Sequence, residues 1–203
     1  MGSELNVPTP RLPPIPGEQT RKIAEALGVP APMANAQAFA VLMRNERVFG
    51  GLWSLMQSLI QNARLDARFR ELIIMRLAWS MGAEYEWAQH WRRGLERGLT
   101  REELAGVRNW QAFPGYSEAD RAVLAATDET LTVNTITPQT WARCAAALGD
   151  EQALIELVVV IGYWRLFGGM LLSLDIPLDA GNESWPPDGI GPTAAARHRP
   201  AME

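Results

Sequence analysis

The 203-residue sequence contains a single cysteine, Cys144, and this scarcity excludes two kinds of chemistry. One cysteine can form neither an internal disulfide nor the paired thiols of a dithiol redox centre within one chain. We expect Cys144 to be a small, buried residue on a helix. The alternative that stays open is an exposed, reactive thiol in a redox protein.

Histidine is almost as scarce, since His90 and His198 are the only two. A metal site needs more ligands than the one histidine of the central region supplies, so we expect no metal. The sequence also lacks a glycine-rich phosphate loop and a serine in a nucleophile-elbow motif. We therefore expect a protein that works without a cofactor.

Positive charge is not in excess either, because the net charge is −4 and Lys22 is the only lysine. Proteins that bind nucleic acids generally need a basic face to neutralise phosphates, so we expect no nucleic-acid partner. No basic segment followed by an apolar run opens the sequence, which favours a soluble, cytoplasmic protein over a secreted one.

One long apolar run, "ALIELVVVIGYWRLFGGMLLSL" at residues 153–174, is long enough to cross a membrane. Glu156 and Arg165 interrupt it, and an arginine near the middle would cost several kcal/mol in lipid. We therefore expect a helix buried in a soluble protein, and no membrane partner.

The sequence lacks the alternation of apolar and polar residues that marks β-strands, and apolar residues recur instead at helical spacing from residue 36 onwards. We predict an all-α fold with antiparallel helices. Three regions are expected: a proline-rich extension with one short helix (1–35), a helical domain (36–179) and a flexible tail rich in Pro, Gly and Ala (180–203).

Several helix ends can be predicted from capping residues. Thr100 is followed three residues later by Glu103, and Ser117 by Asp120, so each pair can form a reciprocal cap. Thr137 precedes a proline at the first helical position. Gly28 and Gly149 are expected to end helices.

Three residues stand out as candidates for acid–base chemistry. Glu86 and His90 are four apart in "EYEWAQH" and therefore share one helix face, where a carboxylate can set the tautomer of an imidazole. An ordinary surface pair is the alternative. Glu71 lies in an apolar stretch, and a buried carboxylate needs a partner or has a raised pKa. A buried ion pair with Arg76 or another arginine remains the other reading.

The string "RELIIMRLAWSMGAEYEWAQHWRRGLERGLTREE" (residues 70–103) resembles the carboxymuconolactone decarboxylase and AhpD-like superfamily. The later "DEQALIELVVVIGYW" and "LLSLDIPLD" are similar to the closing helix of the same proteins. The resemblance implies an AhpD-like all-α fold and a homo-oligomer (dimer, trimer or hexamer), often with the active site near a subunit interface.

The peroxidase branch of this superfamily uses a glutamate followed by C-x-x-C-x-x-x-H. Glu71 and His90 match the glutamate and the histidine, whereas the two cysteine positions fall on Ala83 and Glu86. The resemblance therefore implies that proton transfer is retained and that dithiol peroxidase chemistry is absent. The decarboxylase branch commonly has E-x-x-x-H, which Glu86 and His90 reproduce.

We expect a cofactor-independent lyase of the carboxymuconolactone decarboxylase type, acting on a small carboxylated lactone or a related oxidised carbon skeleton. His90, Glu71 and Glu86 are the expected catalytic residues, with Glu86 setting the histidine tautomer. Tyr85, Trp87 and Arg76 are the expected substrate-binding residues, and Arg76 would anchor a carboxylate. The alternative is a non-catalytic helical oligomer or binding protein derived from an AhpD-like peroxidase that has lost its cysteines. The first hypothesis predicts a cavity that contains His90 and Glu71, and the second predicts a filled one.

Overall fold

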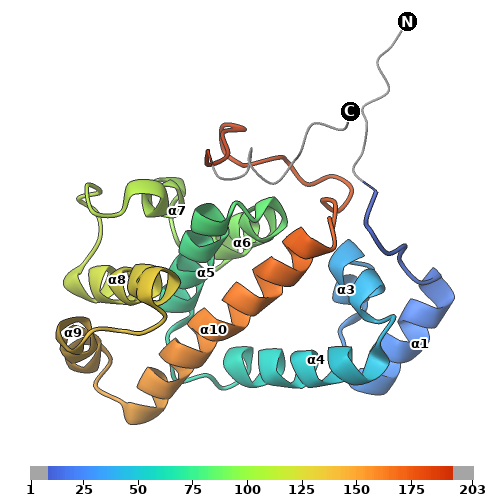
Figure 1. Ribbon diagram of the computed structural model, residues 1–203, viewed down its shortest axis with the longest axis horizontal. Coiled ribbons are helices and arrows are strands. Elements are labelled where there is room, and N and C mark those ends of the chain that lie inside the picture. The colour runs from blue at the N-terminus through green and yellow to red at the C-terminus, as the bar shows by residue number, and fades with distance from the viewer. Residues whose placement is uncertain (1–8, 194–203) are drawn as a thin grey trace, which may run out of the picture.

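The computed structural model describes residues 9–193, and within this range every regular element is a helix, which confirms the predicted all-α class (Figure 1). His198, the first eight residues and the last ten lie outside the described residues. In chain order, the helices are α1 (Gly17–Leu27), α2 (Ala31–Ala34), α3 (Gln37–Leu42), α4 (Glu46–Ile60), α5 (Ala67–Met81), α6 (Glu84–Glu96), α7 (Arg101–Gly106), the 3₁₀ helix η1 (Val107–Asn109), α8 (Glu118–Val133), α9 (Pro138–Leu148) and α10 (Glu151–Ser173).

The capping residues predicted from the sequence begin the helices as expected. Thr100 and Glu103 each accept a hydrogen bond from the other's backbone N–H at the start of α7. Ser117 and Asp120 do the same at the start of α8. The Thr137 side chain accepts a bond from the backbone of α9, which begins with a proline. These local contacts satisfy backbone donors that a helix start leaves free.

A tight turn at Gly82 joins α5 to α6 and determines which side chains of the two helices meet. Gly82 has a φ of 72°, in the left-handed region that glycine enters without steric cost. The chain therefore reverses at once, and α6 packs back along α5. This hairpin brings the middle of α6, with His90, against the first half of α5, with Glu71.

Helix α10 crosses the molecule and packs against α4, α5, α6, α8 and α9 (Figure 1). Leu157 and Ile161 are fully buried on its inner side. Among residues 9–193, α10 alone is long and apolar enough to cross a membrane, although half of its most apolar stretch is buried inside the protein. Its outer side exposes Ile155 and Leu166.

Both ends of the described chain pack onto the helical domain. In the N-terminal region, Ile23 and Ala24 of α1 join the main core, and the indole N–H of Trp53 on α4 donates to the Leu27 carbonyl at 3.0 Å. Helix α1 is therefore integral to the packing of the domain.

Residues 180–193 also pack on the domain, which corrects the expectation of a flexible tail for this part. Trp185 is buried against Trp79 and Trp87, and the Trp87 indole N–H donates to the Pro186 carbonyl at 2.7 Å. An ion pair of 2.7 Å joins Arg108 to Asp188. The composition of this segment suggested a flexible tail, because composition does not show that a single residue, Trp185, can pack against Trp79 and Trp87.

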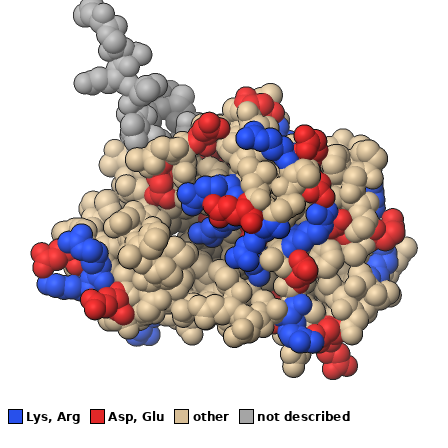
Figure 2. Space-filling view, turned by 180° about the vertical axis from the view of Figure 1, so that it is seen from behind, with Lys and Arg blue, Asp and Glu red and all other residues tan. Residues whose placement is uncertain are grey.

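Charged residues of both signs lie side by side on the face in Figure 2. Among the ion pairs of the described residues, Arg68 pairs with Asp120 and Glu103, and Arg64 pairs with Asp150. The interspersed charges of the sequence are thus neutralised locally at several positions.

Candidate active site

The centre of the site is a hydrogen bond between His90 on α6 and Glu71 on α5. The Nδ1 atom of His90 lies 2.7 Å from Oε2 of Glu71, and each residue is 3% exposed. Such a short bond between buried groups holds the imidazole in one orientation. The predicted catalytic residues Glu71 and His90 are therefore brought together by the α5–α6 hairpin.

The second nitrogen of His90 identifies the tautomer. The indole N–H of Trp164, on α10, points at Nε2 of His90 at 3.3 Å. An indole can only donate, so Nε2 accepts this bond, and Nδ1 carries the ring proton that is donated to Glu71. The lone pair of Nε2 thus faces Trp164 in this structure, and a ligand proton could be accepted there in place of the indole N–H.

Glu71 is held as a carboxylate by its neighbours. Burial raises its pKa, but the contact and hydrogen bond to His90 and the charges of Arg70 and Arg93 outweigh burial, so the net pKa is lowered. Arg70 Nε lies 3.8 Å from Glu71 Oε1 and donates through its NH1 atom to the Leu59 carbonyl. The arginine beside Glu71 is therefore Arg70, and Arg76, which the sequence offered as a partner, lies elsewhere.

Glu86 has a different role from the one predicted. Its Oε2 lies 3.5 Å from Nε2 of His90, whereas Glu71 makes the short bond that sets the tautomer. This Oε2 atom is buried and makes no hydrogen bond with any described residue. Burial raises the pKa of Glu86, and the opposing effects of His90 and Arg93 do not offset it. Burial thus favours the protonated form of Glu86, whose Oε2 faces Nε2 of His90.

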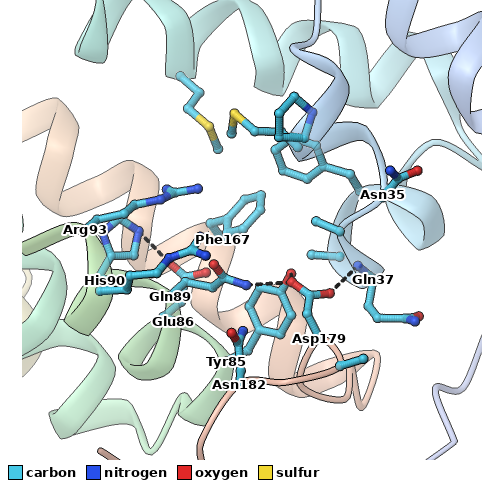
Figure 3. Close-up of a pocket in the computed structure, with 18 of the residues that line it drawn as sticks. Asn35, Gln37, Tyr85, Glu86, Gln89, His90, Arg93, Phe167, Asp179 and Asn182 are labelled. Atoms are coloured by element: carbon cyan, nitrogen blue, oxygen red, sulfur yellow. Dashed lines mark hydrogen bonds and ion pairs between the residues drawn. The ribbon is translucent and has the colours of Figure 1, made fainter. Parts of the chain in front are cut away.

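A cavity of about 420 Å³ opens beside these groups, and Figure 3 shows the side chains that line it. His90 and Glu86 lie in its wall, and Glu71 sits behind His90. Apolar side chains from three helices supply much of the remaining surface, namely Phe39, Met56, Trp164 and Phe167. The volume suits a small organic molecule, and the apolar walls limit the water around it.

Polar groups form another wall of the cavity, around Asp179 in the segment after α10. The Asp179 carboxylate accepts hydrogen bonds from the Tyr85 hydroxyl at 2.8 Å and from Nε2 of Gln89 at 2.5 Å. It also accepts one from the backbone N–H of Gln37 at 2.7 Å. Burial and the nearby Asp179 raise the pKa of Tyr85. Tyr85 thus lines the cavity as a neutral phenol whose proton is already donated.

Two arginines of α6 line the cavity, Arg92 and Arg93. Arg92 lies 3.8 Å from Glu96, whereas Arg93, one helical turn beyond Gln89, forms no ion pair with another described residue. Arg93 was not among the residues predicted from the sequence. Its position three residues after His90, on the same helix face, could have indicated that it lies near the site.

Two expected substrate-binding residues do not line the cavity. Arg76 forms an ion pair with Asp128 at 2.6 Å and donates to the carbonyls of Val107 and Arg108. Trp87 is fully buried in the aromatic cluster with Trp185. Trp87 packs instead against Trp79 and Trp185. Arg76 extends from α5 toward Asp128 of α8 and the carbonyls of η1.

Cys144 is fully buried on α9 and its thiol contacts the Ala122 carbonyl. Burial raises its pKa to about 11, so very little thiolate forms at neutral pH. The expectation of a small buried residue is confirmed, and the redox hypothesis loses its reactive thiol. Among residues 9–193, no group of three or more His, Cys, Asp or Glu side chains is placed to hold a metal ion.

Comparison with known proteins identifies the relatives of this arrangement. Residues 46–129 match the carboxymuconolactone decarboxylase family. Among curated proteins, none matches the sequence significantly.

Three solved structures show the same fold. An uncharacterized peroxidase-related protein with an alkylhydroperoxidase AhpD core, from Ralstonia eutropha, is 11% identical with a TM-score of 0.70, over 85% of this chain and 94% of that chain. An uncharacterized peroxidase-related protein from Silicibacter is 15% identical with a TM-score of 0.66, over 89% and 96%. A variant of the debrominase Bmp8, in complex with 2,3,4-tribromopyrrole, is 16% identical with a TM-score of 0.67, over 89% and 95%. The likeness establishes an AhpD-like helical fold.

Proposed function

We propose that this chain, whose residues 46–129 match the carboxymuconolactone decarboxylase family, is a cofactor-independent acid–base enzyme acting on a small carboxylated lactone or a related oxidised carbon skeleton. His90 is the proposed base, Glu86 the proposed acid, and Glu71 the residue that orients His90. The observation that carries the proposal is the buried 2.7 Å bond between His90 and Glu71 beside a cavity.

The chemistry follows from two neighbouring groups, Nε2 of His90 and the carboxyl group of Glu86, whose Oε2 lies 3.5 Å from it. In a decarboxylation, the C–C bond to the carboxylate breaks, carbon dioxide leaves, and its electron pair moves into the conjugated carbonyl as an enolate. The neutral Glu86 carboxyl can then donate a proton to carbon, and solvent restores that proton. In an isomerisation, Nε2 removes a proton from one carbon and Glu86 delivers one to another.

Arg93 supplies the electrostatic part of the proposal, in place of Arg76. Its guanidinium can hold a substrate carboxylate, and a planar guanidinium matches a carboxylate with two parallel hydrogen bonds. Apolar side chains such as Phe167 and Trp164 surround the site, so this attraction is stronger than it would be in water.

A thiol mechanism of the peroxidase kind is not proposed. Ala83, at the position where the resemblance puts the first cysteine, is a buried N-terminal residue of α6, and Glu86 occupies the second position. The alternative of a non-catalytic oligomer predicted a filled cavity, and a cavity of about 420 Å³ beside His90 favours the enzyme.

The test uses two lactones that differ by one carboxylate. Carbon dioxide release is measured from 4-carboxymuconolactone, and isomerisation or deuterium uptake from ²H₂O is measured by NMR for muconolactone. We expect turnover of at least one probe, reduced roughly 10²- to 10⁴-fold in His90→Ala. The exposed Glu102→Gln variant on α7 serves as the matched control for Glu86→Gln, and only the latter should lose activity.

Two results would count against the proposal. The absence of turnover and of deuterium uptake with both lactones would contradict an acid–base enzyme for this substrate class. Equal rates for the wild type and His90→Ala would leave the activity standing and remove His90 from the mechanism. Circular dichroism of each variant shows whether it is folded.

A further inference from the structure

Asp179 is a carboxylate built into the cavity wall by three donors from different parts of the chain. Gln37 donates from the first residue of α3, and Tyr85 and Gln89 donate from the first half of α6. No cation pairs with this carboxylate in the described residues. Hydrogen bonds alone therefore stabilise the Asp179 carboxylate at the surface of a partly apolar cavity, where a carboxylate without partners would be costly in free energy.

The hydrogen-bond capacity of Asp179 is not exhausted by these donors. A carboxylate offers about four acceptor positions, and three are occupied, two of them on Oδ2. Nearby in the same segment, Asn182 lines the cavity, and its Nδ2 atom is buried without a hydrogen-bond partner among the described residues. This end of the cavity thus has one free acceptor position on an anion, whereas the buried Nδ2 atom of Asn182 has no surface that a ligand could reach.

A hydroxyl group matches the free acceptor position, because its proton can be donated to Asp179. A carboxylate has no proton to donate, and it would bring a second negative charge against Asp179. Like charges placed together in this way discriminate strongly between ligands of similar shape.

A positive charge, that of Arg93, lies at the other side of the cavity. Figure 3 shows Arg93 beside His90 on one side, and Asp179 with Gln37 on the other, with Tyr85, Glu86 and Gln89 between them. Arg93 forms no ion pair with a described residue, so its charge is available to a ligand. The cavity therefore has a cationic side and an anionic side, with the proposed acid–base pair at the cationic side.

We infer that the cavity favours a substrate with one carboxylate, held by Arg93, and one hydroxyl, held by Asp179, and that it disfavours a carboxylate at the Asp179 side. This inference rests on the proposed function for the statement that the ligand is a substrate. The polarity of binding stands on the geometry alone. Asp179 is thus a specificity-determining residue, and it takes no part in proton transfer.

The test is a binding measurement that requires no turnover. Isothermal titration calorimetry compares three ligands with one ring and one carboxylate in common: 4-hydroxybenzoate, benzoate and terephthalate. We expect 4-hydroxybenzoate to bind at least about tenfold more tightly than benzoate, the effect of one hydrogen bond to a charged group. Terephthalate should bind more weakly than benzoate. Equal or tighter binding of terephthalate, or no heat with 4-hydroxybenzoate at millimolar concentrations, would overturn the inference.

Two variants separate the contributions of the anionic side. Asp179→Asn keeps the size of the side chain and removes its charge, so the gap between terephthalate and 4-hydroxybenzoate should shrink to within about threefold. Asp175→Asn is the matched control, because Asp175 pairs with Arg11 on the surface and does not line the cavity. In this variant the difference in affinity between terephthalate and 4-hydroxybenzoate should equal that of the wild type. Asn182→Ala removes a side chain whose Nδ2 atom the ligand does not reach, so it should leave the ranking of the three ligands unchanged.

Arg93→Gln tests the cationic side and should weaken all three ligands alike. If Asp179→Asn leaves the wild-type ranking unchanged, the assignment of this residue is wrong. The inference and the proposed function can fail separately. An inactive protein that still prefers 4-hydroxybenzoate contradicts only the function, and lactone turnover without that preference contradicts only the inference.

Discussion

Nε2 of His90 lies 3.5 Å from Glu86, its neighbour one helical turn away, while Nδ1 of the same ring makes a 2.7 Å bond to Glu71, nineteen residues away in the chain. One imidazole therefore stands between two buried carboxyl groups whose pKa values are shifted in opposite directions. The lowered pKa of Glu71 marks an anion that orients the ring. The raised pKa of Glu86 marks an acid that can give up a proton. Groups with environments that separate their pKa values in this way are typical of acid–base sites.

Glu71→Gln should reduce kcat/KM by roughly 10²-fold on whichever lactone is turned over, because the amide no longer fixes the proton on Nδ1. The rate should fall mainly through kcat, since Glu71 sits behind His90 and does not line the cavity. Steady-state kinetics on Glu71→Gln and on Glu102→Gln measure the effect. A change confined to KM would contradict a role in orienting His90.

The activity should fall as the pH rises through the pKa of Glu86. Burial raises this pKa, so the acid form persists above the range in which an ordinary glutamate has ionised. A rate profile between about pH 4 and pH 10 should therefore have an alkaline limb in the wild type. In Glu86→Gln the remaining activity should lack that limb. An identical limb in both proteins would assign it to another group.

The two glutamates should affect stability with opposite dependence on pH. The pKa of Glu71 is lowered on folding, so its contribution is present above the ordinary value of 4.5 and is lost as the pH falls through the folded-state pKa. The pKa of Glu86 is raised, so the wild type loses stability as the pH rises above 4.5. Urea unfolding at several pH values should show Glu71→Gln less stable than the wild type, most clearly at neutral pH. Glu86→Gln should gain over the wild type as the pH rises.

Trp185→Ala should lower the free energy of unfolding by about 3–5 kcal/mol, because a buried indole is lost from the contacts with Trp79 and Trp87. Ile190→Ala is the control from this segment, where the side chain is 60% exposed, and it should change stability by less than about 0.5 kcal/mol. Equal effects of both variants would contradict the packing of residues 180–193.

We propose that the exposed side of α10 forms the contact between copies of this chain, in line with the homo-oligomer that the resemblance implies. Ile155 is 65% exposed and Leu166 is 52% exposed, and both lie on one side of this helix with Val158. Light scattering at tens of micromolar should show an oligomer, and Ile155→Glu with Leu166→Glu should reduce its mass. Val133→Glu, an exposed apolar site on α8, is the control. A monomeric wild type would contradict the proposal.

Local signals in the sequence predicted most of the fold. Caps such as Thr100 with Glu103 depend on residues three apart, so the chain alone specifies them. The burial of Glu71 could be predicted for the same reason, since apolar neighbours surround it in the sequence. Which side of each helix faces the cavity could not be predicted for α5, because a helix that is apolar nearly all round gives no preferred direction. The choice of Arg76 failed on this point.

The far wall of the cavity could not be predicted because its contacts are long-range. Asp179 meets Gln37, 142 residues away, and Tyr85, 94 residues away, and no short pattern records such a pair. The roles of Glu71 and Glu86 were exchanged for a related reason. Spacing of four residues favoured Glu86 as the partner of His90, whereas the Gly82 turn places Glu71 closer.

The family match covers one part of the cavity and leaves out another. Residues 46–129 contain Glu71, Glu86 and His90, whereas Asp179 lies beyond them. Under the proposals made above, substitutions at Asp179 would change which molecule the cavity accepts, and the proposed acid–base groups on the α5–α6 hairpin would stay in place.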